Sequence, residues 1–144
     1  MNRVLILVLL LGLLLTGCAS GSSVTDTAAE GKVIQTAKGQ YTDIGVSELQ
    51  TMLENKDFVF VNVHIPFEGN IAGTDLSIPY NKIDQHLDQL PGDKNAKIVL
   101  YCRSDSMSHD AARVLADLGY TNLYNLDGGF NAWKAAGLPL EMEP

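Results

Sequence analysis

Short apolar runs recur along the chain at intervals that suit the strands of a buried sheet. Ile98 to Tyr101 is the clearest of them, because four apolar residues in a row are typical of a strand that is buried on both faces. The other runs are likewise bounded by glycine, proline, asparagine or charged residues, which favour turns. The predicted strands are residues 41–44, 58–63, 76–78, 98–101 and 122–126.

Between these strands, apolar residues recur three and four positions apart, which predicts helices with one buried face. Asn81 is expected to cap the second helix and Gly119 to end the third in a left-handed turn. Gly128 and Gly129 open a last helix that extends through Trp133, an expected core residue. This alternation of strands and helices predicts an α/β domain with a mostly parallel central sheet. The periodic positions are Val46, Leu49, Met52 and Leu53, then Ile83, Leu87 and Leu90, and then Ala111, Val114, Leu115 and Leu118.

A loop of residues 102–107 connects the 98–101 strand to a predicted helix that has Ser108 as its N-cap and Asp110 in its first turn. Cys102 therefore follows a buried strand, at the sheet edge where α/β proteins bind their ligands. Free N–H groups and the positive end of the helix dipole favour a thiolate or a bound anion there. Cys102 is a candidate nucleophile, although a free cysteine in such a place is also common as a small buried apolar residue.

Tyr101-Cys102-Arg103-Ser104 before a helix resembles the active-site loop of a rhodanese-like (sulfurtransferase) domain. Three further stretches are similar to that family in order and spacing, so the resemblance covers residues 41–141. These stretches are Phe58 to His64 with Gly73 and Ile78-Pro79 behind it, Leu118 to Leu126, and Asp127 to Trp133 with Gly137-Leu138-Pro139 behind it.

The resemblance implies a three-layer α/β domain over residues 39–142, with about five strands in its sheet and helices on both faces. It also implies that Cys102 is catalytic. In this family the cysteine takes a sulfane sulfur from thiosulfate, a persulfide or a polysulfide and holds it as a transient persulfide. It then passes the sulfur to cyanide or a thiol, and no resident cofactor is needed. His64 and Glu68, on the loop after the 58–63 strand, are candidates for the pocket rim. The substrate-binding residues implied by the loop are Arg103, Ser104, Asp105, Ser106, Met107 and Ser108.

Several positions depart from the family pattern. Asn62 and His64 stand where an acid and an arginine are common, and Asp105-Ser106 where glycine and a basic residue are common. Asp105 is expected to oppose thiolate formation and anionic donors, which favours donors less charged than thiosulfate. A non-catalytic sulfur carrier or partner-binding module is therefore the alternative. Phosphatase or arsenate-reductase chemistry is disfavoured, because Met107 and Ser108 stand where those loops carry an anion-binding arginine.

Residues 1–18 have the pattern of a bacterial lipoprotein signal peptide. Arg3 gives a short positive start, an apolar run follows, and Leu15-Thr16-Gly17-Cys18 resembles a lipobox, whose cysteine is lipidated and becomes the new N-terminus. Residues 19–38 are predicted to be a flexible polar spacer. We expect the protein in the cell envelope, outside the cytoplasm, held to a membrane by acyl chains such as palmitate on Cys18. In a Gram-negative cell this means the outer membrane or periplasm.

The charge and the cysteine content of the chain limit the kinds of binding partner that we expect. Seventeen acidic residues stand against ten basic ones with no basic cluster, which argues against nucleic acid. The chain has two cysteines, so lipidation of Cys18 would leave Cys102 without a disulfide partner. His64, His86 and His109 are scattered without zinc-type spacing, so no metal site is expected. The prediction is a monomer whose partners are small sulfur donors and acceptors.

Overall fold

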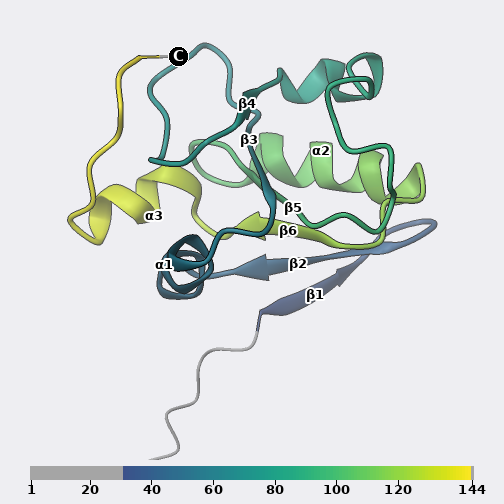
Figure 1. Ribbon diagram of the computed structural model, residues 1–144, viewed down its shortest axis with the longest axis horizontal. Helices are drawn as coiled ribbons and strands as arrows, with labels where there is room; N and C mark the ends of the chain where they lie inside the picture. Colours follow the sequence, from purple (N-terminus) through teal and green to yellow (C-terminus); the bar gives the residue numbers. More distant parts are fainter. Residues whose placement is uncertain (1–30, 144) are drawn as a thin grey trace, which may run out of the picture.

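A mixed six-stranded sheet runs through residues 31–143, the part of the chain that the computed structural model describes (Figure 1). Its strands are β1 (Lys32–Gln35), β2 (Gln40–Ile44), β3 (Val59–Asn62), β4 (Leu76–Ser77), β5 (Ile98–Tyr101) and β6 (Leu123–Leu126). They lie in the order β1-β2-β6-β5-β3-β4, with β1 antiparallel to β2 and every other neighbouring pair parallel. The predicted mostly parallel sheet is confirmed.

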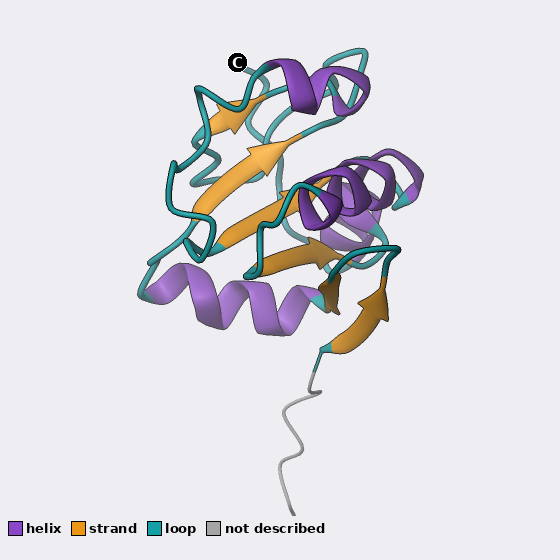
Figure 2. Ribbon diagram, turned by 90° about the vertical axis from the view of Figure 1, so that its right-hand side faces the viewer, coloured by secondary structure: helices purple, strands orange, loops and turns teal. Residues whose placement is uncertain are grey.

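Helices lie on opposite sides of these strands (Figure 2). They are α1 (Val46–Glu54), the 3₁₀ helix η1 (Tyr80–Gln85), α2 (Ser106–Asp117) and α3 (Gly129–Ala135). On one face, α1 and α3 pack through Leu49, Phe130 and Trp133, and on the other, α2 and η1 pack through Leu115 and Ile83. The three-layer arrangement implied by the family resemblance is confirmed, and Trp133 lies in the core as expected.

β5 lies inside the sheet, between β6 and β3, and contributes to both cores. Ile98 and Leu100 pack on the α2 side, whereas Val99 and Tyr101 pack on the side of α1 and α3. All four side chains are fully buried, as the unbroken apolar run predicts. The next residue, Cys102, is therefore held at the end of a strand that is fixed from both faces.

The structure differs from the predicted spacer over its last residues, because β1 forms there. Lys32 pairs with Asp43 and Gln35 with Gln40, so β1 adds a hairpin to the edge of the sheet. Most of its side chains are exposed, and its sequence therefore lacks the apolar pattern of the inner strands. The sheet has six strands rather than about five, and the domain begins before residue 39. The predicted signal peptide and Cys18 lie outside the described residues; within residues 31–143, no helix is long and apolar enough to cross a membrane.

The helix predicted after Asn81 forms instead as the short helix η1, which begins at Tyr80 directly behind Pro79. Its buried residue, Ile83, packs in the α2 core as the periodicity predicts. The N–H of His86 donates to the carbonyl of Ile83, three residues back, which is the spacing of a 3₁₀ turn rather than of an α-helix. Tyr80, the first residue of η1, follows the end of β4 and lies beside the carboxyl edge of the sheet.

α2 begins at Ser106 and presents a different face to the sheet from the predicted one. Val114 and Leu118, two predicted core positions, are 37% and 44% exposed. Short alanine side chains on the buried face allow the helix to approach the sheet closely, which the larger apolar residues would prevent. Gly119 ends the helix with a φ of 93°, the left-handed turn that was predicted. The buried residues of α2 are Ser108, Ala111, Ala112, Leu115 and Ala116.

Candidate active site

Cys102 lies directly after β5, at the carboxyl edge of the parallel strands, and is 2% exposed. Its Sγ accepts hydrogen bonds from the backbone N–H of Asp105 at 3.2 Å and from the hydroxyl of Ser108 at 3.3 Å. Hydrogen-bond donors of this kind stabilise negative charge on the sulfur. The predicted placement of the thiol, between a buried strand and a helix N-terminus, is confirmed.

The loop after the thiol is shorter than predicted. It spans residues 102–105, because α2 begins at Ser106, and the N-cap position belongs to Asp105 rather than Ser108. Ser108 lies in the first turn of the helix instead, fully buried, with its hydroxyl on the thiol sulfur. Apolar periodicity does not reveal this start, because the buried residue of the first turn is polar.

Asp105 has a φ of 92°, a left-handed conformation that residues other than glycine rarely adopt. Its carboxylate accepts a hydrogen bond from the N–H of Gly128 at 2.8 Å and lies 3.5 Å from the amide nitrogen of Asn125. The side chain therefore points toward the connection between β6 and α3, and it is not among the residues that line the pocket beside Cys102. This placement does not support the expectation that the Asp105 carboxylate repels an anionic donor. The side chain anchors the loop instead.

Asn125 extends this anchor across the sheet. Its amide also donates to the carboxylate of Asp43 at 2.9 Å, and Nε2 of His109 lies 3.2 Å from the same oxygen. His109 thereby connects α2 to β2.

Among residues 31–143, no group of three or more His, Cys, Asp and Glu side chains could hold a metal ion.

The start of α3 holds the Cys102 loop from its backbone side. The N–H of Phe130 donates to the carbonyl of Cys102 at 2.9 Å, and the N–H of Asn131 donates to that of Arg103 at 3.0 Å. Gly129 makes this approach feasible, because a Cβ at that position would lie 2.3 Å from the carbonyl oxygen of Cys102. Gly129 therefore serves the backbone geometry of this junction.

The loop after β3 brings His64 to the same edge of the sheet. Asn62, which is buried, fixes this loop: its Oδ1 accepts the N–H of His64 at 2.9 Å, and its Nδ2 donates to Asn70 at 2.9 Å and to the carbonyl of Gly69 at 3.1 Å. The His64 ring packs edge-on against Phe130, with 5.3 Å between the ring centroids. Asn62 therefore positions the loop by hydrogen bonding.

Tyr101 supports the same loop from inside the core. Its hydroxyl accepts the N–H of Ile71 at 3.0 Å and lies 2.7 Å from the hydroxyl of Thr74. Burial raises the pKa of Tyr101 to about 12, because a phenolate would be desolvated there. The phenol therefore stays protonated at neutral pH and keeps its hydrogen bonds to the loop.

A pocket of about 180 Å³ opens beside the thiol at the carboxyl ends of β3, β4 and β5. It brings together the predicted residues Cys102 and His64 with most of the predicted loop, whereas Asp105 and Ser108 are not in the lining. Glu68 lies at the rim, where its carboxylate accepts a hydrogen bond from Arg103 at 3.2 Å. The lining residues are His64, Tyr80, Cys102, Arg103, Ser104, Ser106 and Met107.

Tyr80 is the lining residue that the sequence analysis missed. It follows β4, which pairs in parallel with β3, so its position at the same sheet edge follows from the strand order. The sequence signal for this position is Ile78-Pro79, which is part of the family resemblance. This pair ends a predicted strand immediately before Tyr80.

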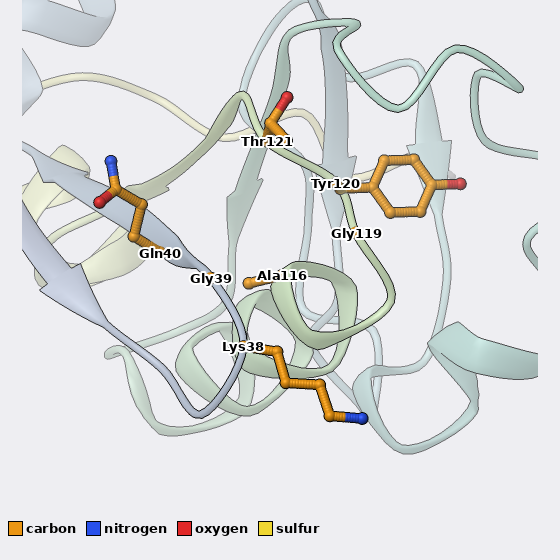
Figure 3. Close-up of a pocket in the computed structure, with 7 residues that line it drawn as sticks. All are labelled: Lys38, Gly39, Gln40, Ala116, Gly119, Tyr120 and Thr121. Carbon is orange, nitrogen blue, oxygen red and sulfur yellow. The ribbon is translucent and has the colours of Figure 1, made fainter.

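A second, larger hollow of about 280 Å³ lies at the opposite end of the sheet (Figure 3). It is formed by the turn before β2 and the end of α2, and Lys38 contributes its one charged side chain. No cysteine, carboxylate or histidine lines it. The smaller pocket beside Cys102 is therefore the candidate active site.

Comparison of the whole sequence with known families agrees with this geometry. The profile of the rhodanese-like domain matches residues 46–136. The chain belongs to the rhodanese-like domain family. The matched region runs from the start of α1 to the end of α3 and contains every residue that lines the pocket.

Known rhodanese-like relatives include proteins named as sulfurtransferases. A sulfurtransferase of Allochromatium vinosum is 33% identical over 94 residues, which are 63% of this chain and 85% of that protein. The thiosulfate sulfurtransferase GlpE of Vibrio cholerae is 29% identical over 103 residues, 70% of this chain and 95% of GlpE. A solved rhodanese-related protein from Thermoplasma volcanium is similar with a TM-score of 0.60 and 26% identity, covering 70% of this chain and 98% of that one.

Proposed function

We propose that this rhodanese-like protein is a sulfurtransferase that carries a sulfane sulfur as a persulfide on Cys102. The observation that supports the proposal most directly is the pair of donors at the sulfur, the N–H of Asp105 and the hydroxyl of Ser108. The short loop and the start of α2 fix both donors in place. Donors that are already oriented stabilise an anionic sulfur without rearrangement during the reaction.

With thiosulfate as the donor, the Cys102 thiolate attacks the outer sulfur and a new S–S bond forms. The bond from that sulfur to the sulfonate breaks, and its electron pair leaves with sulfite. Cyanide or an acceptor thiolate then attacks the terminal sulfur of the persulfide. The S–S bond breaks, the Cys102 thiolate is restored, and thiocyanate or an acceptor persulfide leaves. The cycle needs no resident cofactor.

Mass spectrometry of the protein after incubation with thiosulfate or a small persulfide tests the proposal. We expect the mass of one added sulfur atom, located on the peptide that contains Cys102. Addition of cyanide should remove this mass and release an equal amount of thiocyanate. If no sulfane donor adds sulfur to the protein, or if the sulfur is attached to another residue, the proposal is wrong.

A non-catalytic sulfur carrier or partner-binding module is the second candidate. It is favoured by the contact between Arg103 and Glu68, which leaves the basic residue of the loop less available to an anionic donor. The amount of thiocyanate distinguishes the two functions. An enzyme produces many thiocyanate molecules per Cys102 when donor and cyanide are in excess, whereas a carrier loaded by its partner produces one.

We also propose that acyl chains on Cys18 hold the domain at a membrane of the cell envelope. The support is the sequence pattern of residues 1–18, which lie outside the residues that the structure describes. Changing Cys18→Ala is expected to abolish incorporation of labelled palmitate and to leave the protein soluble or unprocessed. Gel detection of the label and cell fractionation measure both effects. Cys102→Ala is the matched control, since it removes the other cysteine, and acyl label that survives in Cys18→Ala would refute the assignment.

A further inference from the structure

We propose that Glu68 determines donor specificity at this site, by occupying the basic groups that an anionic sulfur donor would use. The inference rests on the proposed sulfurtransferase function and assigns the donor class. It predicts that donors without a charged group beyond the reacting sulfurs are preferred over thiosulfate. The sequence suggested the same preference because of Asp105, whereas the structure assigns the responsible carboxylate to Glu68.

The first observation is the contact of one carboxylate oxygen with two bases. Oε1 of Glu68 accepts a hydrogen bond from Nη1 of Arg103 at 3.2 Å and lies 3.4 Å from Nε2 of His64. Arg103 and His64 both line the pocket beside Cys102. The remaining lining residues, apart from the thiol, are uncharged, so these two side chains are the basic groups that the lining offers to an anion.

The second observation is the state of His64 itself. Its side chain is 4% exposed, and neither ring nitrogen has a hydrogen-bond partner within the described part of the chain. The 3.4 Å contact to Glu68 is longer than a hydrogen bond and leaves the imidazole unsatisfied. A buried polar group in this state gains from a closer acceptor, so His64 and Arg103 together form a site suited to an anion.

Glu68 is placed to compete for that site. Its side chain is 38% exposed and Arg103 is 53% exposed, so the pair lies at the rim and can part without disturbing the core. A thiosulfate dianion must displace the carboxylate or bind beside it, and both routes oppose its binding. A persulfide such as hydroxyethyl persulfide has no charge on its carbon end, so Glu68 affects it less. In that case the Cys102 thiolate attacks the outer sulfur of the protonated persulfide, and the S–S bond of the donor breaks. The thiolate of 2-mercaptoethanol leaves with the electron pair and takes up the proton of the donor, which leaves a persulfide anion on Cys102.

The test compares the full-length chain with its Glu68→Gln and Asp57→Asn variants. Asp57 is an exposed carboxylate paired with Lys97. The two residues precede β3 and β5, so they lie at the opposite sheet edge from Cys102. Asp57→Asn therefore changes the net charge as Glu68→Gln does, but away from the pocket. Single-turnover loading of Cys102 is followed by the added sulfur mass, with thiosulfate and with hydroxyethyl persulfide. Glu68→Gln is expected to raise the loading rate with thiosulfate, relative to that with the persulfide, about tenfold at low salt. Asp57→Asn should leave this ratio unchanged, and the gain should shrink as salt screens the charge.

An unchanged ratio in Glu68→Gln, or an equal rise in Asp57→Asn, would overturn the inference while leaving the sulfurtransferase function in place. Failure of both donors to load the unmodified protein would instead reject the proposed function and the inference with it. Thermal unfolding of each variant verifies that the fold is intact.

Discussion

Replacing Cys102→Ser is expected to abolish persulfide formation and sulfur transfer while the fold remains intact. A serine hydroxyl is not ionised at neutral pH and forms no persulfide, so the transfer rate should fall at least about 10³-fold, to that of the reaction without protein. Serine can accept the hydrogen bonds that Asp105 and Ser108 donate to the sulfur. The free energy of unfolding should therefore change by no more than about 1 kcal/mol.

Thiocyanate release and urea unfolding measure the two effects. Unmodified protein that has been alkylated at Cys102 beforehand is the control, because it blocks the same atom without a substitution. Transfer at the original rate in Cys102→Ser would mean that another residue carries the sulfur.

Gly129→Ala is expected to impair both the stability of the fold and persulfide formation. The new methyl carbon would lie 2.3 Å from the carbonyl oxygen of Cys102 and 2.7 Å from the carbonyl carbon of Arg103. Both are backbone atoms, so the active-site loop and the start of α3 must separate. Clash, the left-handed φ of 53° and lost hydrogen bonds together should lower the free energy of unfolding by about 3 kcal/mol. Displacement of the loop should slow persulfide formation at least about tenfold.

Gly137→Ala provides the matched control for this prediction. Gly137 has a φ of 81°, but a Cβ there would meet nothing within 4 Å. Its cost should be limited to backbone strain, about 1 kcal/mol, with no effect on persulfide formation. Urea unfolding and single-turnover loading compare the two variants. Equal losses in both would show that the close approach to Cys102 has no special importance.

Apolar periodicity predicts the strands and helices that bury a face in the core, and single residues such as glycine predict where helices end. Ile98 to Tyr101 could be placed on a buried strand, and Gly119 at a helix end, because each pattern has one dominant structural meaning. The position of Cys102 follows from these two predictions. For the same reason, the placement of Cys102 between a buried strand and a helix could be predicted without a structure.

The features that were missed depend on partners far along the chain. Asp105 is separated by 23 residues from Gly128, whose N–H turns its carboxylate away from the pocket, and nothing near Asp105 signals this bond. β1 is a strand only because it pairs with β2, since its exposed side chains carry no apolar pattern. The sequence makes Glu68 a candidate for the pocket rim, but it does not reveal the contact with Arg103, which forms only where two loops meet.

β1 runs opposite to β2, so the described chain enters the sheet at the edge that carries Cys102. Lys32 pairs with Asp43, next to the carboxyl end of β2 (Figure 1). β1 is three strands from β5 in the sheet, a separation of about 14 Å. With Cys18 anchored as proposed, the tether would therefore join the domain on the side that carries the pocket. Sulfur carriers at the membrane surface would then meet the tethered side of the domain, where Cys102 lies.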